Sequence, residues 1–189
     1  MAERDALLLS TFNFRIALRR SPQAVGGAAR DPEAQEGDLL GEGGFQECTG
    51  LSIELDVAEL QEGGRNDGVI RRVGRAKYQP VVLKRGMFVP RPNAQAQAQP
   101  AAAPEKVNGD LWAWLQGIAS GVVPVARYDG TIEVLDNRGE RDEQEAVVLA
   151  TWTFVRGLPA KVSGPQLNAK TGEIALEELT IHHEGLRFE

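Results

Sequence analysis

The sequence is poor in cysteine, in long apolar runs and in positive charge, and each shortage excludes a class of protein. Cys48 is the only cysteine, so the chain can form neither an internal disulfide nor a cysteine-based zinc site. The apolar run from Ala6 to Leu9 is too short for a signal peptide, and no run approaches the roughly 18 apolar residues of a membrane helix. We therefore expect assembly in the cytosol, without direct membrane anchoring.

Catalytic motifs are also missing. The glycine-rich stretch 41–44 lacks the Lys-Ser or Lys-Thr of a phosphate-binding loop, and no Gly-x-Ser-x-Gly sequence is present. His182, His183 and Glu184 form the one cluster of metal-ligand residue types, but adjacent residues on a strand point to opposite faces. Cys48 lies in no nucleophile motif. These features favour a protein that is not an enzyme and uses no cofactor. A ligand-binding or enzymatic monomeric β-barrel stays the alternative.

The net charge of −6 weighs against nucleic-acid binding, because neutralising phosphates requires a positive field. Apolar residues make up 42% of the 189 residues and charged residues 25%, which is ordinary for one folded domain. We predict a single domain over residues 1–189 with no specific nucleic-acid binding.

Alternating apolar and polar residues predict that most of the chain is β-strand. The expected strands are residues 11–18, 45–49, 51–57, 69–78, 78–88, 127–136, 145–158 and 174–183. The strand at 145–158 is apolar on both faces, so we expect it to be covered on both sides. One short helix is expected over 110–120, capped at its start by Asn108 or Asp110 and ended by Gly121. The pattern predicts a mainly β fold, a barrel or sandwich with one packed helix.

Two long segments interrupt this pattern. Residues 20–44 are rich in Gly, Ala, Pro, Asp and Glu without a period, and residues 91–108 contain the low-complexity run NAQAQAQPAAAP. Such long connections are uncommon in compact domains. We expect an extended loop at 20–44 and an insertion at 91–108 that adds little to the core.

The stretch from Phe45 to Phe88 carries the charges that we single out. Its second strand is acidic on one face, and the strand that follows is basic on one face. Opposite charges across two strands are favourable by a few tenths to about 1 kcal/mol. We interpret them as a structural ladder, within or between subunits, because a nucleic-acid site would need interleaved aromatic residues. The candidate subunit or ring contacts, some in the glycine-rich connection between these strands, are Glu54, Asp56, Glu62, Arg65, Asp67, Arg71, Arg75 and Lys77.

Several short sequences resemble a known family. FQECTGL, EGG and LKRG, all within residues 45–86, resemble the tail-tube proteins of T4-like contractile phage tails. They also resemble the inner-tube and tube-initiator proteins of extracellular contractile injection systems of the Photorhabdus virulence cassette and antifeeding prophage type. Trp112, Trp114, GPQLNA and the C-terminal IALEELTIHHEGL continue the resemblance, which covers nearly the whole chain apart from the two long segments.

The resemblance implies a small β-barrel related to the haemolysin-coregulated protein, assembled as hexameric rings that stack into a hollow tube. The inner sheets of the six subunits would join into one barrel around the channel. The implied partners are other copies, the sheath, the baseplate or spike, other tube proteins, and cargo or DNA in the lumen. The protein would be a component of a phage tail or phage-tail-like particle, which can be released outside the cell.

Three features depart from the main-tube pattern: the two long segments and residues 64–74. Repeating the 91–108 insertion along a tube would crowd the sheath, whereas a specialised ring has more freedom. We therefore favour a tube-initiator ring at the baseplate slightly over a main tube subunit. The glycine-rich connection at 61–68 is our candidate for stacking ring on ring.

Overall fold

The computed structural model describes residues 9–22, 39–40, 44–61, 63–64, 67–87, 107–136, 147–170 and 172–189. Most of the 20–44 loop and of the 91–108 insertion lies outside these residues. The elements are β1 (Phe14–Arg20), β2 (Phe45–Thr49), β3 (Ile53–Leu60), β4 (Ile70–Tyr78), β5 (Val81–Gly86), α1 (Asp110–Ala119), β6 (Tyr128–Leu135), β7 (Val148–Ser163), β8 (Leu176–His182) and β9 (Gly185–Phe188). The prediction of a mainly β fold with one packed helix is confirmed.

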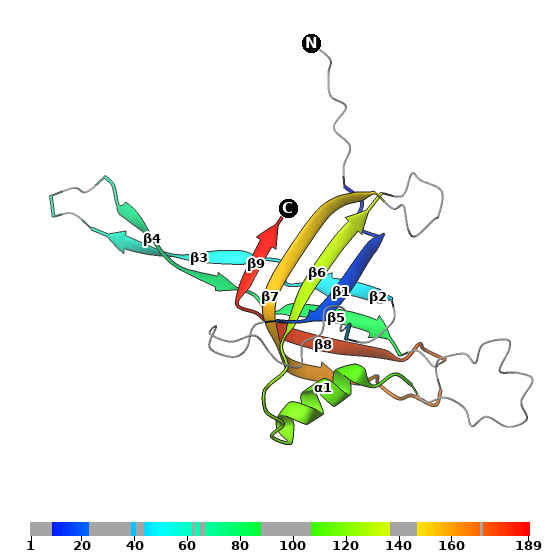
Figure 1. Cartoon of the computed structure of the whole chain (residues 1–189). Helices are drawn as coiled ribbons and strands as arrows, with labels where there is room; N and C mark the ends of the chain where they lie inside the picture. Colours follow the sequence, from blue (N-terminus) through cyan, green and yellow to red (C-terminus); the bar gives the residue numbers. More distant parts are fainter. Residues whose placement is uncertain are drawn as a thin grey trace, which may run out of the picture.

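One antiparallel sheet runs through the body in the order β1-β6-β7-β8-β5-β2, with β9 also paired to β7. The 16-residue strand β7 joins its two halves, because its first part pairs with β6 and β9 and its last part with β8. Figure 1 shows β7 running from one half of the sheet into the other. Within the described residues the path ends at β1 and β2, so the sheet of a single chain does not close into a barrel.

The core lies between the two halves of this sheet, and α1 packs against it (Figure 1). Inward positions alternate with outward ones along β5, β6 and β8, as period-two patterning requires. Each fully buried large side chain contributes roughly 1.5–3 kcal/mol relative to an exposed one. The buried core residues are Leu18, Leu40, Val81, Leu83, Leu111, Trp114, Ile132, Phe154, Leu179, Ile181 and Leu186.

The helix matches its prediction except at its start. Leu111 and Trp114 are buried, and Gly121, with φ of 85°, follows the last turn. The N-cap residue is Gly109, so neither predicted residue is the cap. Asn108 instead accepts a hydrogen bond from the backbone N–H of Asp110 through Oδ1, at 2.9 Å. The side chain of Asn108 thus closes the turn that precedes the helix and does not cap the first helical turn.

Three strand predictions need correction. Phe12 lies before β1 and is 76% exposed, so the first strand begins later than its alternation suggests. The chain turns at His183 and Glu184, which adds the short strand β9 to the predicted set. Val155 is exposed on β7, as is Leu149, so this strand is not covered on both sides in a single chain.

Candidate assembly interface

β3 and β4 form an arm that projects from the body (Figure 1). The two strands pair with each other and with no other described strand. Every residue of β3 is exposed, and on β4 only Ile70 is partly covered. A two-stranded hairpin is marginally stable at best in water. β3, which its alternation predicted to be a barrel strand, therefore lies outside the core of the single chain.

A β-bulge determines which side chains share a face of the arm. Leu55 pairs with Ala76 but Val57 pairs with Val73, so Asp56 faces two residues of β4, Gly74 and Arg75. A Cβ atom added at Gly74 would lie 2.8 Å from the carbonyl oxygen of Asp56, so a residue without a side chain is needed at this close approach.

The bulge splits the predicted basic face. Arg71 pairs directly with Glu59 and Lys77 with Glu54, and these two partners lie on opposite faces of β3. The expectation that Arg71, Arg75 and Lys77 share a face is therefore wrong, because the extra residue reverses the alternation. One face of the arm is left largely apolar, with the exposed side chains Ile53, Leu55, Val57, Val73 and Tyr78.

The predicted charged residues of the arm form some ion pairs within the chain. Lys77 Nζ lies 2.7 Å from Asp56 Oδ1, and this hydrogen bond and the charge of Asp56 raise the pKa of Lys77. Arg71 Nε lies 3.2 Å from Glu59 Oε1, a partner that the sequence did not suggest. These pairs are exposed and contribute little stability.

Three of the five remaining predicted contacts lie among the described residues. Glu54 is paired in register with Lys77, Arg75 lies in the bulge, and Asp67 lies at the tip of the arm. Glu62 and Arg65 lie outside the described residues.

A row of alternating charge crosses the outer face of the body sheet. Lys84 on β5 forms an ion pair of 2.9 Å with Glu47 on β2 and is paired in register with Glu178 on β8. Lys161 on β7 continues the row at 3.6 Å from Glu178. This charged row (Glu47, Lys84, Glu178 and Lys161) begins with a carboxylate on β2 and ends with an ammonium group on β7.

Both strands that end the charged row have an unpaired edge. β2 pairs only with β5, and β7 beyond Gly157 pairs only with β8 among the described strands. Unpaired strand edges present backbone N–H and C=O groups to which another strand can pair. The body thus offers two edges of opposite terminal charge.

A buried ion pair anchors β5 to β8. Arg85 and Glu177 are opposite each other in register, and Arg85 Nε donates to Glu177 Oε1 at 2.5 Å. Trp112 of the helix donates from Nε1 to Glu177 Oε2 at 3.0 Å. Arg85 and Glu177 are 2% and 1% exposed. Sequence reasoning missed this site; its one signal was that Arg85 shares the inward alternation of Val81 and Leu83.

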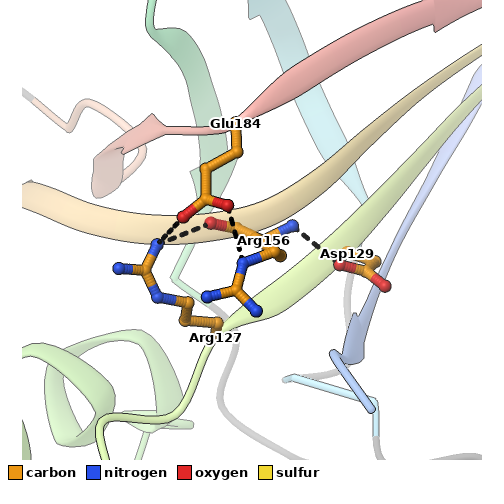
Figure 2. A network of polar contacts seen from close by, with 4 residues as sticks. All are labelled: Arg127, Asp129, Arg156 and Glu184. Atoms are coloured by element: carbon orange, nitrogen blue, oxygen red, sulfur yellow. Dashed lines mark hydrogen bonds and ion pairs between the residues drawn. The ribbon is translucent and has the colours of Figure 1, made fainter. Parts of the chain in front are cut away.

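A second polar network holds the bend of β7 (Figure 2). Glu184 accepts from Arg127 Nη1 at 3.1 Å and from Arg156 Nε at 2.7 Å, so one carboxylate bridges two guanidinium groups. Asp129 Oδ1 accepts from the backbone N–H of Arg156 at 2.8 Å. Arg156 has φ of 56°, a conformation that costs energy for a residue with a side chain and persists where its surroundings hold it.

Reactive groups are not gathered into a site in the described part of the chain. Burial raises the pKa of Cys48 to about 11, which keeps this side chain a thiol at neutral pH. An open pocket follows β7 and holds one carboxylate; its lining is Gln166, Leu167, Asn168, Ala169, Glu173 and Ala175. Among the described residues no three His, Cys, Asp or Glu side chains are placed to hold a metal ion, and no helix is long and apolar enough to cross a membrane.

The family model described as T4-like virus tail tube protein gp19 matches residues 10–98 and 106–187. The chain belongs to this tail tube protein family. It is a structural protein of the tail tube type, not an enzyme. The resemblance drawn from its short sequences is thereby confirmed. No curated protein matches the chain.

Solved structures share the tail tube fold over almost the whole chain. A chain of the anti-feeding prophage baseplate, 6-fold symmetrised, matches with a TM-score of 0.68 and 16% identity, covering 97% of each chain. A chain of the sheath-tube complex of PVC, an extracellular contractile injection system, matches with a TM-score of 0.62 and 18% identity, covering 98% of this chain and 93% of that one. A chain of the anti-feeding prophage cap gives 0.66 and 17%, covering 100% and 95%.

Proposed function

We propose that this tail tube protein assembles as a hexameric ring in the inner tube of a contractile, phage-tail-like injection particle. Its partners would be further copies, the sheath, the baseplate or spike, and cargo or DNA in the lumen. Cytosolic assembly and release in the particle belong to the same proposal. The observation that carries it is the pair of unpaired strand edges with opposite terminal charge, on a chain that the family model matches almost throughout.

The charged row supports ring closure by head-to-tail contact. Four antiparallel strands, β2, β5, β8 and β7, place β2 and β7 in opposite directions at the two edges. A neighbouring copy whose β7 meets β2 therefore continues the antiparallel order. It also brings Lys161 of one copy toward Glu47 of the next, so the charges keep alternating across the boundary. A contact between two different edges repeats from copy to copy, and it closes into a ring when the rotations from copy to copy add up to one full turn.

The arm supplies the second proposed contact. The candidate contacts at Glu54, Asp56, Arg71, Arg75 and Lys77 lie on a hairpin that no other described element covers. Its apolar face would be buried against another subunit, with its charged face setting the alignment. Asp67 lies at the tip of the arm, and the connection 61–68, whose sequence also contains Glu62 and Arg65, is the proposed place of ring-on-ring stacking.

The edge contact is tested by mixing two charge-reversal variants. In Glu47→Lys both edges are positive, and in Lys161→Glu both are negative, so each variant alone is expected to form fewer rings in sedimentation and electron microscopy. An equimolar mixture restores opposite charges at every boundary of an alternating ring with an even number of subunits. Ring formation should therefore recover in the mixture. Normal rings from each variant alone, or a mixture as defective as its parts, would contradict the edge contact.

Within the tube we place this protein in an initiator ring at the baseplate, in preference to the repeating tube. The support is the 91–108 insertion, which would recur at every ring of a main tube. Copy number per particle separates the two roles: an initiator is present as one ring whatever the tube length, whereas a main tube subunit increases in proportion to length. Quantitative mass spectrometry of purified particles against a sheath peptide measures this ratio, and a copy number that follows the sheath assigns the main tube.

A further inference from the structure

His183 lies where the arm joins the body. It follows β8 and precedes β9, and its ring stacks on Phe154 of the core at 5.4 Å with an interplanar angle of 30°. The ring of Tyr78, the last residue of β4, also lies near it, with 5.5 Å between the ring centroids. Nε2 of His183 is 3.2 Å from the carbonyl oxygen of Gln79, the first residue after the arm. One imidazole therefore contacts both the core and the base of the arm.

The hydrogen bond to Gln79 selects one tautomer of the neutral ring. A carbonyl oxygen only accepts hydrogen bonds, so Nε2 carries the hydrogen and Nδ1 carries the lone pair. Nδ1 is buried and meets hydrogen-bond geometry with no described group, although the nearby backbone of Gly185 favours the charged ring. A second proton on Nδ1 would place a charged N–H group in this buried position, and the loss of hydration makes that costly.

The groups around His183 determine the direction in which its pKa is shifted. Burial lowers the pKa of His183, the backbone hydrogen bonds at Gln79 and Gly185 raise it, and the neighbouring His182 lowers it further. Tyr78 is the titratable side chain in contact from the arm, while Glu184 is directed to Arg127 and Arg156. A ring released to water regains the ordinary pKa of about 6.5. The released state thus binds the proton more tightly, so the contact is stable above pH 6.5 and weakens as the pH falls below it.

We propose that neutral His183 is a latch that holds the arm in one direction relative to the body, and that protonation at acidic pH releases the arm. Because the arm carries proposed subunit contacts, this inference rests on the proposed function where it concerns assembly: acidification would disfavour the ring through His183. The latch itself is a property of the single subunit.

Nuclear magnetic resonance of dilute, monomeric protein between pH 7.5 and 5.0 tests the latch. The Cε1–H signal follows protonation of His183, ring-to-ring contacts with Tyr78 report the latched state, and hydrogen exchange of the Gln79 amide reports opening at the base of the arm. We expect the Tyr78 contacts to disappear and exchange of Gln79, corrected for its intrinsic pH dependence, to rise severalfold with the midpoint of the His183 titration. Protonation of His183 that leaves both reporters unchanged would overturn the proposal.

Two variants serve as matched tests. His183→Gln keeps an N–H group for the carbonyl of Gln79 but cannot titrate, so exchange of Gln79 should lose its pH dependence; persistence of that dependence in this variant overturns the latch. His182→Gln, on the exposed neighbour, should keep the pH dependence of Gln79 exchange, with at most a small shift of its midpoint. If His183→Gln does not fold, the unchanged protein decides: the latch requires the midpoint of Gln79 exchange to agree with the midpoint of the His183 titration, and a disagreement overturns it. Sedimentation at pH 7.5 tests the proposed function separately, because absence of rings contradicts the assembly role and does not affect the latch. Conversely, an arm that stays fixed when His183 is protonated contradicts the latch and does not affect the assembly role.

Discussion

At the scale of single residues, the strongest demands on side-chain identity lie inside the body. Arg85 and Glu177 are almost fully buried and face each other in register, and Glu177 also accepts a hydrogen bond from Trp112. A buried ion pair adds little stability over an apolar pair, but removing one partner leaves an uncompensated charge. The exposed pairs on the arm and along the charged row lack this penalty, which leaves their charges available for contacts between subunits.

The first prediction concerns this buried pair. Glu177→Gln keeps the shape of the side chain but leaves the guanidinium of Arg85 without a counter-charge, so we expect the free energy of unfolding to fall by about 3 kcal/mol or more. Urea denaturation measures the change. Glu178→Gln, one residue along and facing outward, is the control and should cost about 1 kcal/mol or less. Equal effects of the two changes would contradict the assigned role of the buried pair.

The second prediction concerns Cys48. With its pKa raised to about 11 by burial, about one thiol in a thousand is ionised at pH 8. Alkylation by iodoacetamide should therefore be much slower in the folded protein than in urea, and its rate should rise with pH until about pH 11. A folded protein that reacts as fast as the unfolded chain at pH 8 would show that the thiol is accessible and ionised.

At the scale of elements, the arm is a continuation of the body hairpin beyond a sharp bend. β2 leads into β3 through Gly50, which has φ of 87°, and β4 leads into β5 through Pro80. A Cβ atom at Gly50 would also overlap the carbonyl oxygen of Pro80, at 1.9 Å. The direction of the arm thus depends on position 50, which only glycine can occupy without strain.

Comparing two glycines tests this dependence. Gly64 has φ of 92° with no atom within 4 Å of an added Cβ, so Gly64→Ala should cost only the left-handed backbone penalty of roughly 1–2 kcal/mol. Gly50→Ala has the same penalty and the clash with Pro80, so its loss of stability in thermal unfolding should be clearly larger. A Gly50→Ala loss no larger than that of Gly64→Ala would mean that the bend relaxes without cost.

The fourth prediction concerns the charges of the arm. Glu54→Lys and Arg75→Glu alter exposed residues, so we expect nearly unchanged thermal unfolding but reduced ring or tube formation in sedimentation and electron microscopy. Arg75 is the cleaner test, because Glu54 faces Lys77 in register and its charge acts on the pKa of Lys77. Lys170→Glu, a charge reversal outside the arm and the charged row, should assemble normally. Normal tubes from both arm variants would exclude these charges as subunit contacts.

At the scale of the whole molecule, the uncovered surfaces fit a subunit better than an independent protein. The sheet of the single chain stays open at β1 and β2, the arm stands apart from the core, and apolar side chains remain exposed on both β3 and β7. A ring in which β7 of one copy pairs with β2 of the next, and in which neighbours cover these faces, would remove two exposed edges. Family membership and this incompleteness point to the same structural role.

Deletion of residues 93–104 is the fifth prediction, at this scale. The run contains alanine, glutamine, proline and one asparagine and offers little apolar surface to a core, so the midpoint of thermal unfolding should change by only a few degrees. If the run binds the baseplate, initiation of tubes should fail while the variant still forms rings on its own. A variant that unfolds at much lower temperature would show that the run contributes to the core instead.

Much of the fold could be predicted because local patterning reports it directly. The extended segment predicted at 45–49 and ended by Gly50 matches β2, and the spacing of Leu111 and Trp114 placed the helix. The bulge at Gly74 could not be predicted, because one extra residue changes nothing in composition yet reverses the face of every residue beyond it. For the candidate interface, charges on β3 and β4 were anticipated, whereas the charged row joins residues from four strands that are distant in sequence.

The sequence by itself determined the family, the mainly β fold and the absence of recognisable catalytic motifs, since these depend on short motifs and on period-two alternation that are visible in the order of the residues alone. Only the tertiary structure decided which apolar stripes are core and which are surface. Alternation shows that a strand has an apolar face but not what covers that face; β8 meets the core, whereas β3 extends beyond it. Burial is a property of neighbours brought together by folding, and for this protein some of those neighbours are, by our proposal, other copies of the chain.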